Sequence, residues 1–220
     1  MLKKKSCRKY IQFFETVAVL VAITATARAS VTQFNTDPFA GTTVLTAPGR
    51  QIVGGELFTT FDIATDVFSF DPSVFGIGDT IHFANGLAGN LPTTGLNVVV
   101  LQSFDNDANP GTPFGAGNAA SLIADQITSP GPGFFIYFNS GLDLARLVYS
   151  TDLSDDTADL KVMARFLNLT GQAGRDAIPT ITEANFEVAT APDAGNTLGL
   201  LSTACGALMV AGCTFSRRIA

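Results

Sequence analysis

Short segments in which apolar and polar residues alternate predict strands that are buried on one face. In residues 182–188 the side chains of Ala184, Phe186 and Val188 fall on one face, with charged or polar residues between them. Residues 160–166 alternate in the same way, with an apolar residue at every even position. Because a period of two residues is that of a β-strand, both segments predict strands with one face towards the core.

Two nearly continuous apolar runs, residues 97–104 and residues 134–138, predict central strands. A strand that is buried on both faces has no polar face and so shows no alternation. The pattern elsewhere predicts three further strands, at residues 62–70, 80–84 and 145–150, and one helix, at residues 119–127.

Clusters of turn-forming residues separate these short strands. Asp71-Pro72-Ser73 and Ser129-Pro130-Gly131-Pro132-Gly133 are two of them. Many short strands with such turns between them are typical of an all-β domain. We therefore expect a mainly β fold, a single antiparallel β-sandwich or jelly-roll-like domain, over residues 30–190.

The first 29 residues have the three parts of a secretory signal peptide. A basic start contains Lys3 to Lys5, residues 16–23 are apolar, and small residues follow up to Ala29. An uncleaved membrane anchor is the alternative, but the apolar stretch is too short to cross a bilayer core of about 30 Å. We expect residues 1–29 to be removed by cleavage after Ala29.

The C-terminal end carries a second apolar segment, which is long enough to cross a membrane. Residues 197–215 contain no charged residue, and at about 1.5 Å per residue a helix of this length spans about 28 Å. Arg217 and Arg218 follow, and basic residues mark the cytoplasmic side of a membrane-spanning helix. The pattern predicts a C-terminal transmembrane helix with a basic tail.

The residues before this helix carry a family resemblance. The order of Ala191-Pro192-Asp193-Ala194-Gly195-Asn196-Thr197, an apolar helix and a terminal arginine pair resembles a PEP-CTERM-class sorting signal. It is most similar to the VPDSG-CTERM variant, from which it departs by Ala191 in place of valine. The resemblance covers residues 191–220 and gives no information on the domain before them, although residues 134–144 are similar to exported proteins of this kind to which no activity is assigned.

The resemblance implies a processing enzyme and a location. Proteins with such tails are handled by an exosortase, a membrane enzyme similar to a transpeptidase, and are often associated with the exopolysaccharide matrix of Gram-negative bacteria. It implies an exported protein at the cell surface or outside the cell, tethered to the membrane before processing. The residues that it assigns to the sorting signal are Pro192, Asp193, Gly195, Thr197, Arg217 and Arg218.

The net charge of the predicted domain limits which kinds of molecule it can bind. Between residues 30 and 190 there are seventeen Asp and Glu and five basic residues, a net charge of −12 against −6 for the whole chain. Such a domain repels nucleic acid, which needs a basic surface. The five basic residues between residues 30 and 190 are Arg50, Arg146, Lys161, Arg165 and Arg175.

All three cysteines lie in the two terminal segments, so the domain has no thiol for catalysis, metal binding or a disulfide.

Asp105, Asp107 and Asn109 are a candidate Ca²⁺ site. Oxygen ligands at alternate positions are how a Ca²⁺ loop begins, but Pro110 stands where an EF-hand has glycine, and no glutamate stands at the twelfth position. The sequence therefore excludes an EF-hand and leaves a looser site open. The same spacing is also typical of an Asx-rich turn at the end of a strand.

Three functions remain open. The first is a structural or adhesive protein of an exopolysaccharide matrix, without catalytic activity and without a cofactor other than this Ca²⁺. The second is a Ca²⁺-assisted carbohydrate-binding module, and the third is a polysaccharide hydrolase. The single His82 predicts no catalytic triad, since no nucleophile-elbow sequence accompanies it. We rank the three in this order and expect no enzyme.

Overall fold

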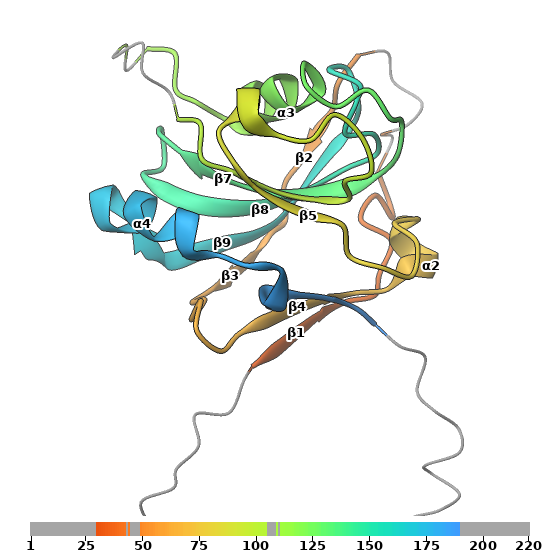
Figure 1. Cartoon of the computed structure of the whole chain (residues 1–220), viewed down its shortest axis with the longest axis horizontal. Helices are drawn as coiled ribbons and strands as arrows, with labels where there is room; N and C mark the ends of the chain where they lie inside the picture. The colour runs from red at the N-terminus through yellow and green to blue at the C-terminus, as the bar shows by residue number, and fades with distance from the viewer. Residues whose placement is uncertain (1–29, 43, 45–48, 105–108, 110, 190–220) are drawn as a thin grey trace, which may run out of the picture.

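The computed structural model describes residues 30–42, 44, 49–104, 109 and 111–189, which form mostly strands with a few short helices (Figure 1). The strands are β1 (Val31–Phe34), β2 (Ile52–Val53), β3 (Leu57–Thr59), β4 (Val67–Phe70), β5 (Phe83–Gly86), β6 (Val98–Leu101), β7 (Gly133–Asn139), β8 (Leu144–Ser150), β9 (Leu160–Thr170) and β10 (Phe186–Val188). The α-helices are α2 (Pro72–Phe75), α3 (Ala116–Ala124) and α4 (Gly171–Ala177), and the 3₁₀ helices are η1 (Ala88–Asn90), η2 (Ile178–Thr180) and η3 (Glu183–Asn185).

The larger of two sheets has seven strands. Strands β5 to β9 follow one another in order, and both β2 and β3 pair with the outer side of β9. Strand β7 and all of β6 are buried on both faces, which confirms the prediction of central strands for residues 134–138 and 97–104, although β6 is shorter than predicted.

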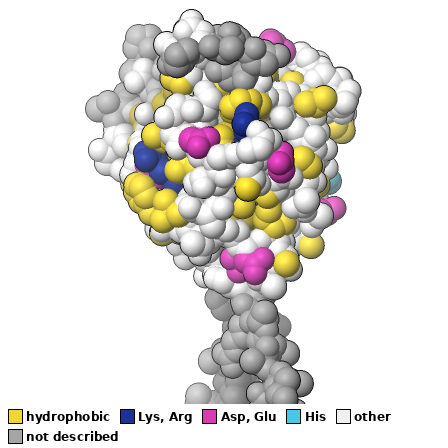
Figure 2. Space-filling view, turned by 90° about the vertical axis from the view of Figure 1, so that its left-hand side faces the viewer, with side chains coloured by type: hydrophobic (Ala, Val, Ile, Leu, Met, Phe, Trp, Pro, Cys, Tyr) yellow, Lys and Arg dark blue, Asp and Glu magenta, His cyan; other side chains and the backbone are white. Residues whose placement is uncertain are grey.

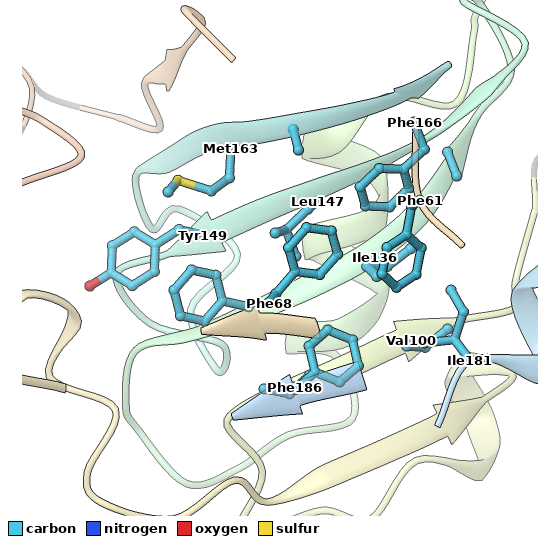
Figure 3. Packing of buried hydrophobic residues seen from close by; sticks show 14 of the residues in the cluster. Phe61, Phe68, Val100, Ile136, Leu147, Tyr149, Met163, Phe166, Ile181 and Phe186 are labelled. Carbon is cyan, nitrogen blue, oxygen red and sulfur yellow. The ribbon is translucent and has the colours of Figure 1, made fainter. Parts of the chain in front are cut away.

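A second sheet of three strands, in the order β1-β4-β10, packs on one face of the large sheet. Phenylalanine rings fill the space between the two sheets (Figure 3). Phe70 of β4 stacks on Phe134 of β7 with ring centroids 3.7 Å apart, and Phe68 packs against Phe166 of β9 at 5.5 Å. Burial of large aromatic side chains is a main source of stability in such a core, so this layer joins the two sheets.

Helix α3 covers the opposite face of the large sheet. Its alanines and Ile123 pack with Phe135, Val148 and Val162 in a second apolar cluster. The helix begins three residues before the predicted range and ends three residues before its end. The large sheet is therefore the middle of three layers, between the small sheet and α3.

The prediction of antiparallel strands is wrong for most of the domain. Of the eight strand pairs among the described residues, only β7–β8 and β8–β9 are antiparallel, and the other six are parallel. Alternation shows which face of a strand is buried but not the direction in which the strand runs. Direction depends on the connections, and the segment between β6 and β7, which contains α3, is long enough to return the chain for a parallel pair.

Strand β9 changes the faces of its side chains at Met163. Leu147 of β8 is opposite Ala164, but the next residue, Val148, is opposite Val162, so β9 carries one extra residue at this point. As a result Val162 lies in the cluster under α3, whereas Ala164 and Phe166 lie in the phenylalanine layer. The prediction that the even positions of residues 160–166 share one face is wrong because this β-bulge inverts the alternation.

Two predicted strands are shorter than the pattern suggested, because side chains form turns within them. In the predicted strand 62–70, Asp62 accepts a hydrogen bond from the Ala64 amide at 3.0 Å, and only β4 is extended. At the start of residues 182–188, Asn185 Oδ1 accepts from the Thr182 amide at 2.9 Å and closes η3. Asp and Asn side chains compete with strand pairing through such local bonds.

We predict that Gly174→Ala destabilises the domain. A Cβ at position 174 of α4 would overlap the carbonyl group of Leu169, a backbone contact that no side-chain rotation relieves. We expect urea titrations to show that the free energy of unfolding falls by about 3 kcal/mol or more. This loss is at or above the upper end of the range that is typical when extra atoms are forced into a packed site. Gly89→Ala is the control, since no atom lies within 4 Å of its Cβ, and equal losses for the two variants would contradict the prediction.

Candidate functional site

Four side chains form a row across the large sheet on the face that α3 partly covers. Phe58 of β3 is opposite Arg165 of β9, Arg165 is opposite Arg146 of β8, and Arg146 is opposite Tyr137 of β7. We call these four residues the arginine row. Tyr137 is the inner end of the row and is fully buried, whereas Phe58 is the outer end and is 59% exposed.

The bulge at Met163 places Arg165 in this row. Without the extra residue, the alternation that places Val162 under α3 would turn Arg165 into the phenylalanine layer. With it, Arg165 lies on the same face as Arg146. Two like charges directly opposite each other on adjacent strands are destabilising, so this arrangement requires a counter-ion.

Glu56, just before β3, supplies that counter-ion. Its Oε1 accepts a hydrogen bond from Arg146 Nη2 at 2.9 Å and another from Arg165 Nε, and its Oε2 accepts from the Gly55 amide at 2.9 Å. The carboxylate side chain is only 6% exposed and that of Arg146 only 12%. One buried carboxylate therefore bridges two guanidinium groups.

The same contacts set the ionisation of Glu56. Burial raises the pKa of a carboxyl group, but here the hydrogen bonds from the backbone and from Arg165, and the charges of Arg165 and Arg146, outweigh it. The pKa of Glu56 is thus held below its ordinary value, and the carboxylate is charged at neutral pH.

At the inner end of the row, polar contacts hold Arg146 in place. Its Nη1 donates to the Tyr137 hydroxyl at 3.4 Å, and Asn139 Nδ2 donates to the same oxygen at 3.0 Å. Arg146 Nε is buried and has no hydrogen-bond partner among the described residues. Two guanidinium groups, Arg146 and Arg165, share the one carboxylate of Glu56, so the site carries a net charge of +1.

At the outer end, Arg165 and Phe58 reach the surface. The guanidinium carbon of Arg165 lies 5.0 Å from the centre of the Phe58 ring, within the range of a cation–π contact. The side chain of Arg165 is 27% exposed, and its two Nη groups bond to no residue that the structure describes. On the face shown in Figure 2, Lys and Arg side chains lie directly beside hydrophobic ones.

The outer end of this site can bind an anion, because the two Nη groups of Arg165 are hydrogen-bond donors on a partly exposed side chain beside the exposed ring of Phe58. Across residues 30–42, 44, 49–104, 109 and 111–189 there is no group of three or more His, Asp or Glu placed to hold a metal ion. His82, exposed as its strand pattern predicts, lies outside this site.

The candidate Ca²⁺ residues are described only in part. Asp105 and Asp107 lie outside the described residues. Asn109 Oδ1 accepts a hydrogen bond from the Gly111 amide at 2.9 Å, as in an Asx turn. Asp152, in the loop after β8, forms a turn of the same kind, since its Oδ1 accepts from the Ser154 amide at 2.8 Å. Asn109, the one candidate ligand that the structure describes, thus closes an Asx turn.

The predicted processing residues also lie outside the described part of the chain. They are Ala29 at the signal cleavage site and Pro192, Asp193, Gly195, Thr197, Arg217 and Arg218 of the sorting signal. Among the residues that the structure does describe, no helix has the length and apolar character needed to cross a membrane.

Comparison of this chain with protein families, with curated proteins and with solved structures finds no match. The arginine row therefore rests on the geometry of this chain alone.

The sequence analysis missed the arginine row, although one signal for it was present. Arg146 and Arg165 each interrupt an apolar strand, and a buried arginine needs a partner. The identity of that partner could not be read from the sequence, because Glu56 lies 90 residues from one arginine and 109 from the other.

We predict that Glu56→Gln lowers the stability of the domain and removes part of its acid sensitivity. Losing one partner of a buried ion pair leaves uncompensated charge, and we expect a cost of about 3 kcal/mol. Because the folded-state pKa is depressed, the contribution of Glu56 is present above its unfolded pKa of about 4.3 and is lost as the pH falls through the folded value.

Urea titrations between pH 7 and pH 3 measure both effects. Wild type should lose stability below about pH 5 more steeply than the variant. Glu187→Gln, which changes an exposed carboxylate of β10, is the control and should follow wild type. Parallel stability curves for wild type and Glu56→Gln would show that the bridge has no such role.

Proposed function

We propose that this chain is an exported protein that an exosortase-type enzyme sorts, and that its domain has a structural or adhesive role in an exopolysaccharide matrix. It acts by binding and not as an enzyme. It works at the surface of a Gram-negative bacterium or outside the cell, and its C-terminal helix holds it in the membrane before processing.

The observation that carries the proposal is the position in the sequence of the first and the last described strand. Strand β1 starts at Val31, two residues after the predicted cleavage site, and β10 ends at Val188, three residues before the sorting motif. Both strands pair with β4 in the small sheet (Figure 1). Removal of residues 1–29 and of the tail from residue 192 would leave every described strand intact.

The contacts of Ser30 support cleavage after Ala29. The Ser30 nitrogen donates to Asp66 Oδ1 at 3.2 Å, and its carbonyl accepts from the Val67 amide at 2.9 Å. Cleavage would turn this nitrogen into an α-ammonium group, with an ordinary pKa of about 8. The new terminus would then face a carboxylate and hold the first residue of the mature protein beside β4.

The intact mass of the protein recovered from its native cell surface and medium tests the proposal. We expect a chain that begins at Ser30 and ends near Pro192. A chain that keeps its C-terminal segment in both fractions would overturn sorting and leave a membrane-anchored protein. Added mass at the new C-terminus would support attachment to an envelope component.

We also predict that Asp66→Asn destabilises the cleaved protein more than the uncleaved one. A surface ion pair stabilises a fold by up to about 1 kcal/mol, and only the cleaved protein has the ammonium group. Thermal melts at pH 7 of both forms measure the difference, with cleavage blocked by large residues at positions 27 and 29. The difference should vanish above about pH 9, where the terminal amine is neutral; a difference that persists there would contradict the ion pair.

A further inference from the structure

We propose that the outer end of the arginine row, Phe58 with Arg165, binds the carboxylate of an acidic sugar in a polysaccharide. This inference rests on the proposed function and names the class of polymer that the domain would meet. The site lies at the edge of the large sheet, where β3 is the outermost strand beside β9.

Arg165 offers the hydrogen-bond donors for a carboxylate. Its Nε is held by Glu56, while both Nη groups donate to no described residue on a side chain that is more than a quarter exposed. The two Nη groups of a guanidinium form a planar fork that fits the two oxygens of a carboxylate. Because Glu56 fixes one edge of the guanidinium, little side-chain freedom is lost when a ligand binds the other.

Phe58 favours a sugar over other carriers of a carboxylate. One part of its ring is in contact with Arg165, and the remainder is open to solvent at 59% exposure. Arginine and large aromatic side chains are enriched among the residues that contribute most to binding. A uronic acid presents a flat apolar ring face next to its carboxylate and can contact both residues, whereas an acidic peptide side chain has no such face.

The charge of the arginine row favours an acidic ligand. Three of the five basic residues of the domain, Arg146, Lys161 and Arg165, lie on β8 and β9. Lys161 is on the face opposite the arginine row and donates to the Gly54 carbonyl. Arg146 and Arg165 share the single carboxylate of Glu56, so the row carries a net charge of +1, which attracts an acidic ligand. Exposed charges further than about 8 Å away are largely screened at physiological salt, so the local excess decides binding.

Arg146 and Tyr137 act in this site as positioning residues. Tyr137, which is fully buried, accepts from Arg146, and Arg146 donates to Glu56, which in turn accepts from Arg165. Changes at either would disturb the fold as well as binding. The test therefore uses Phe58, which is exposed, and Arg165, whose side chain is 27% exposed. Because Arg165 also donates to Glu56, thermal melts of both variants verify that they are folded before binding is measured.

Calorimetric titration of the full chain in mild detergent with galacturonic acid oligomers tests the site. The matched probe is the same oligomer with its carboxyl groups methyl-esterified, which keeps the ring faces and removes the charge. We expect binding of the acidic oligomer, at least tenfold weaker binding by Phe58→Ala, and loss of the preference for the acidic over the esterified oligomer in Arg165→Gln. Leu87→Ala, an exposed apolar residue after β5, is the control and should bind as wild type does.

Other outcomes would overturn the proposal. They are equal binding of the acidic and esterified oligomers, unchanged affinity in both variants, or equal binding of a glutamate decapeptide, which would show a site for acidic peptides. The intact mass tests the proposed function separately. A correctly processed protein that binds no oligomer would overturn this site alone, and a binding protein with unprocessed ends would overturn sorting alone.

Discussion

The β-bulge at Met163 is the constraint on which both the core and the charged site depend. One extra residue in β9 lets a single strand serve two clusters, with Val162 under α3 and Phe166 in the phenylalanine layer. The same inversion turns Arg165 away from that layer and into register with Arg146. Since a side chain changes face with every residue of a strand, a shift of one position decides all of these placements at once.

Two arginines directly opposite each other on adjacent strands repel, so they need a counter-ion. Glu56 approaches from the segment between β2 and β3 and bridges both guanidinium groups, and Tyr137 and Asn139 complete the inner end. A buried ion pair adds little stability relative to an apolar core, and it fixes geometry instead. Here it sets the orientation of Arg165, whose Nη groups donate to no residue that the structure describes and lie beside an exposed phenylalanine.

The phenylalanine layer explains how a domain without cysteine or tryptophan joins a three-stranded sheet to a seven-stranded one. Stacked rings from β4, β7 and β9 fill the space between the sheets, and β1 and β10 extend the small sheet on either side of β4. Both ends of the described domain therefore belong to one small sheet. That arrangement suits a domain whose two flanking segments are removed after export, as we propose.

The sequence by itself determined the predominance of strands and the central positions of β6 and β7, and it indicated residues 30–190 as a candidate domain. These features can be predicted because the burial of a strand determines the local order of apolar and polar residues. The resemblance of residues 191–220 to a sorting signal likewise comes from the sequence, since such a signal is a linear motif. Only the tertiary structure decided that most strands run parallel, that β9 changes face at Met163, and that Glu56 meets Arg146 and Arg165. Those features depend on connections and contacts between residues far apart in the chain, for which a period of two residues carries no information.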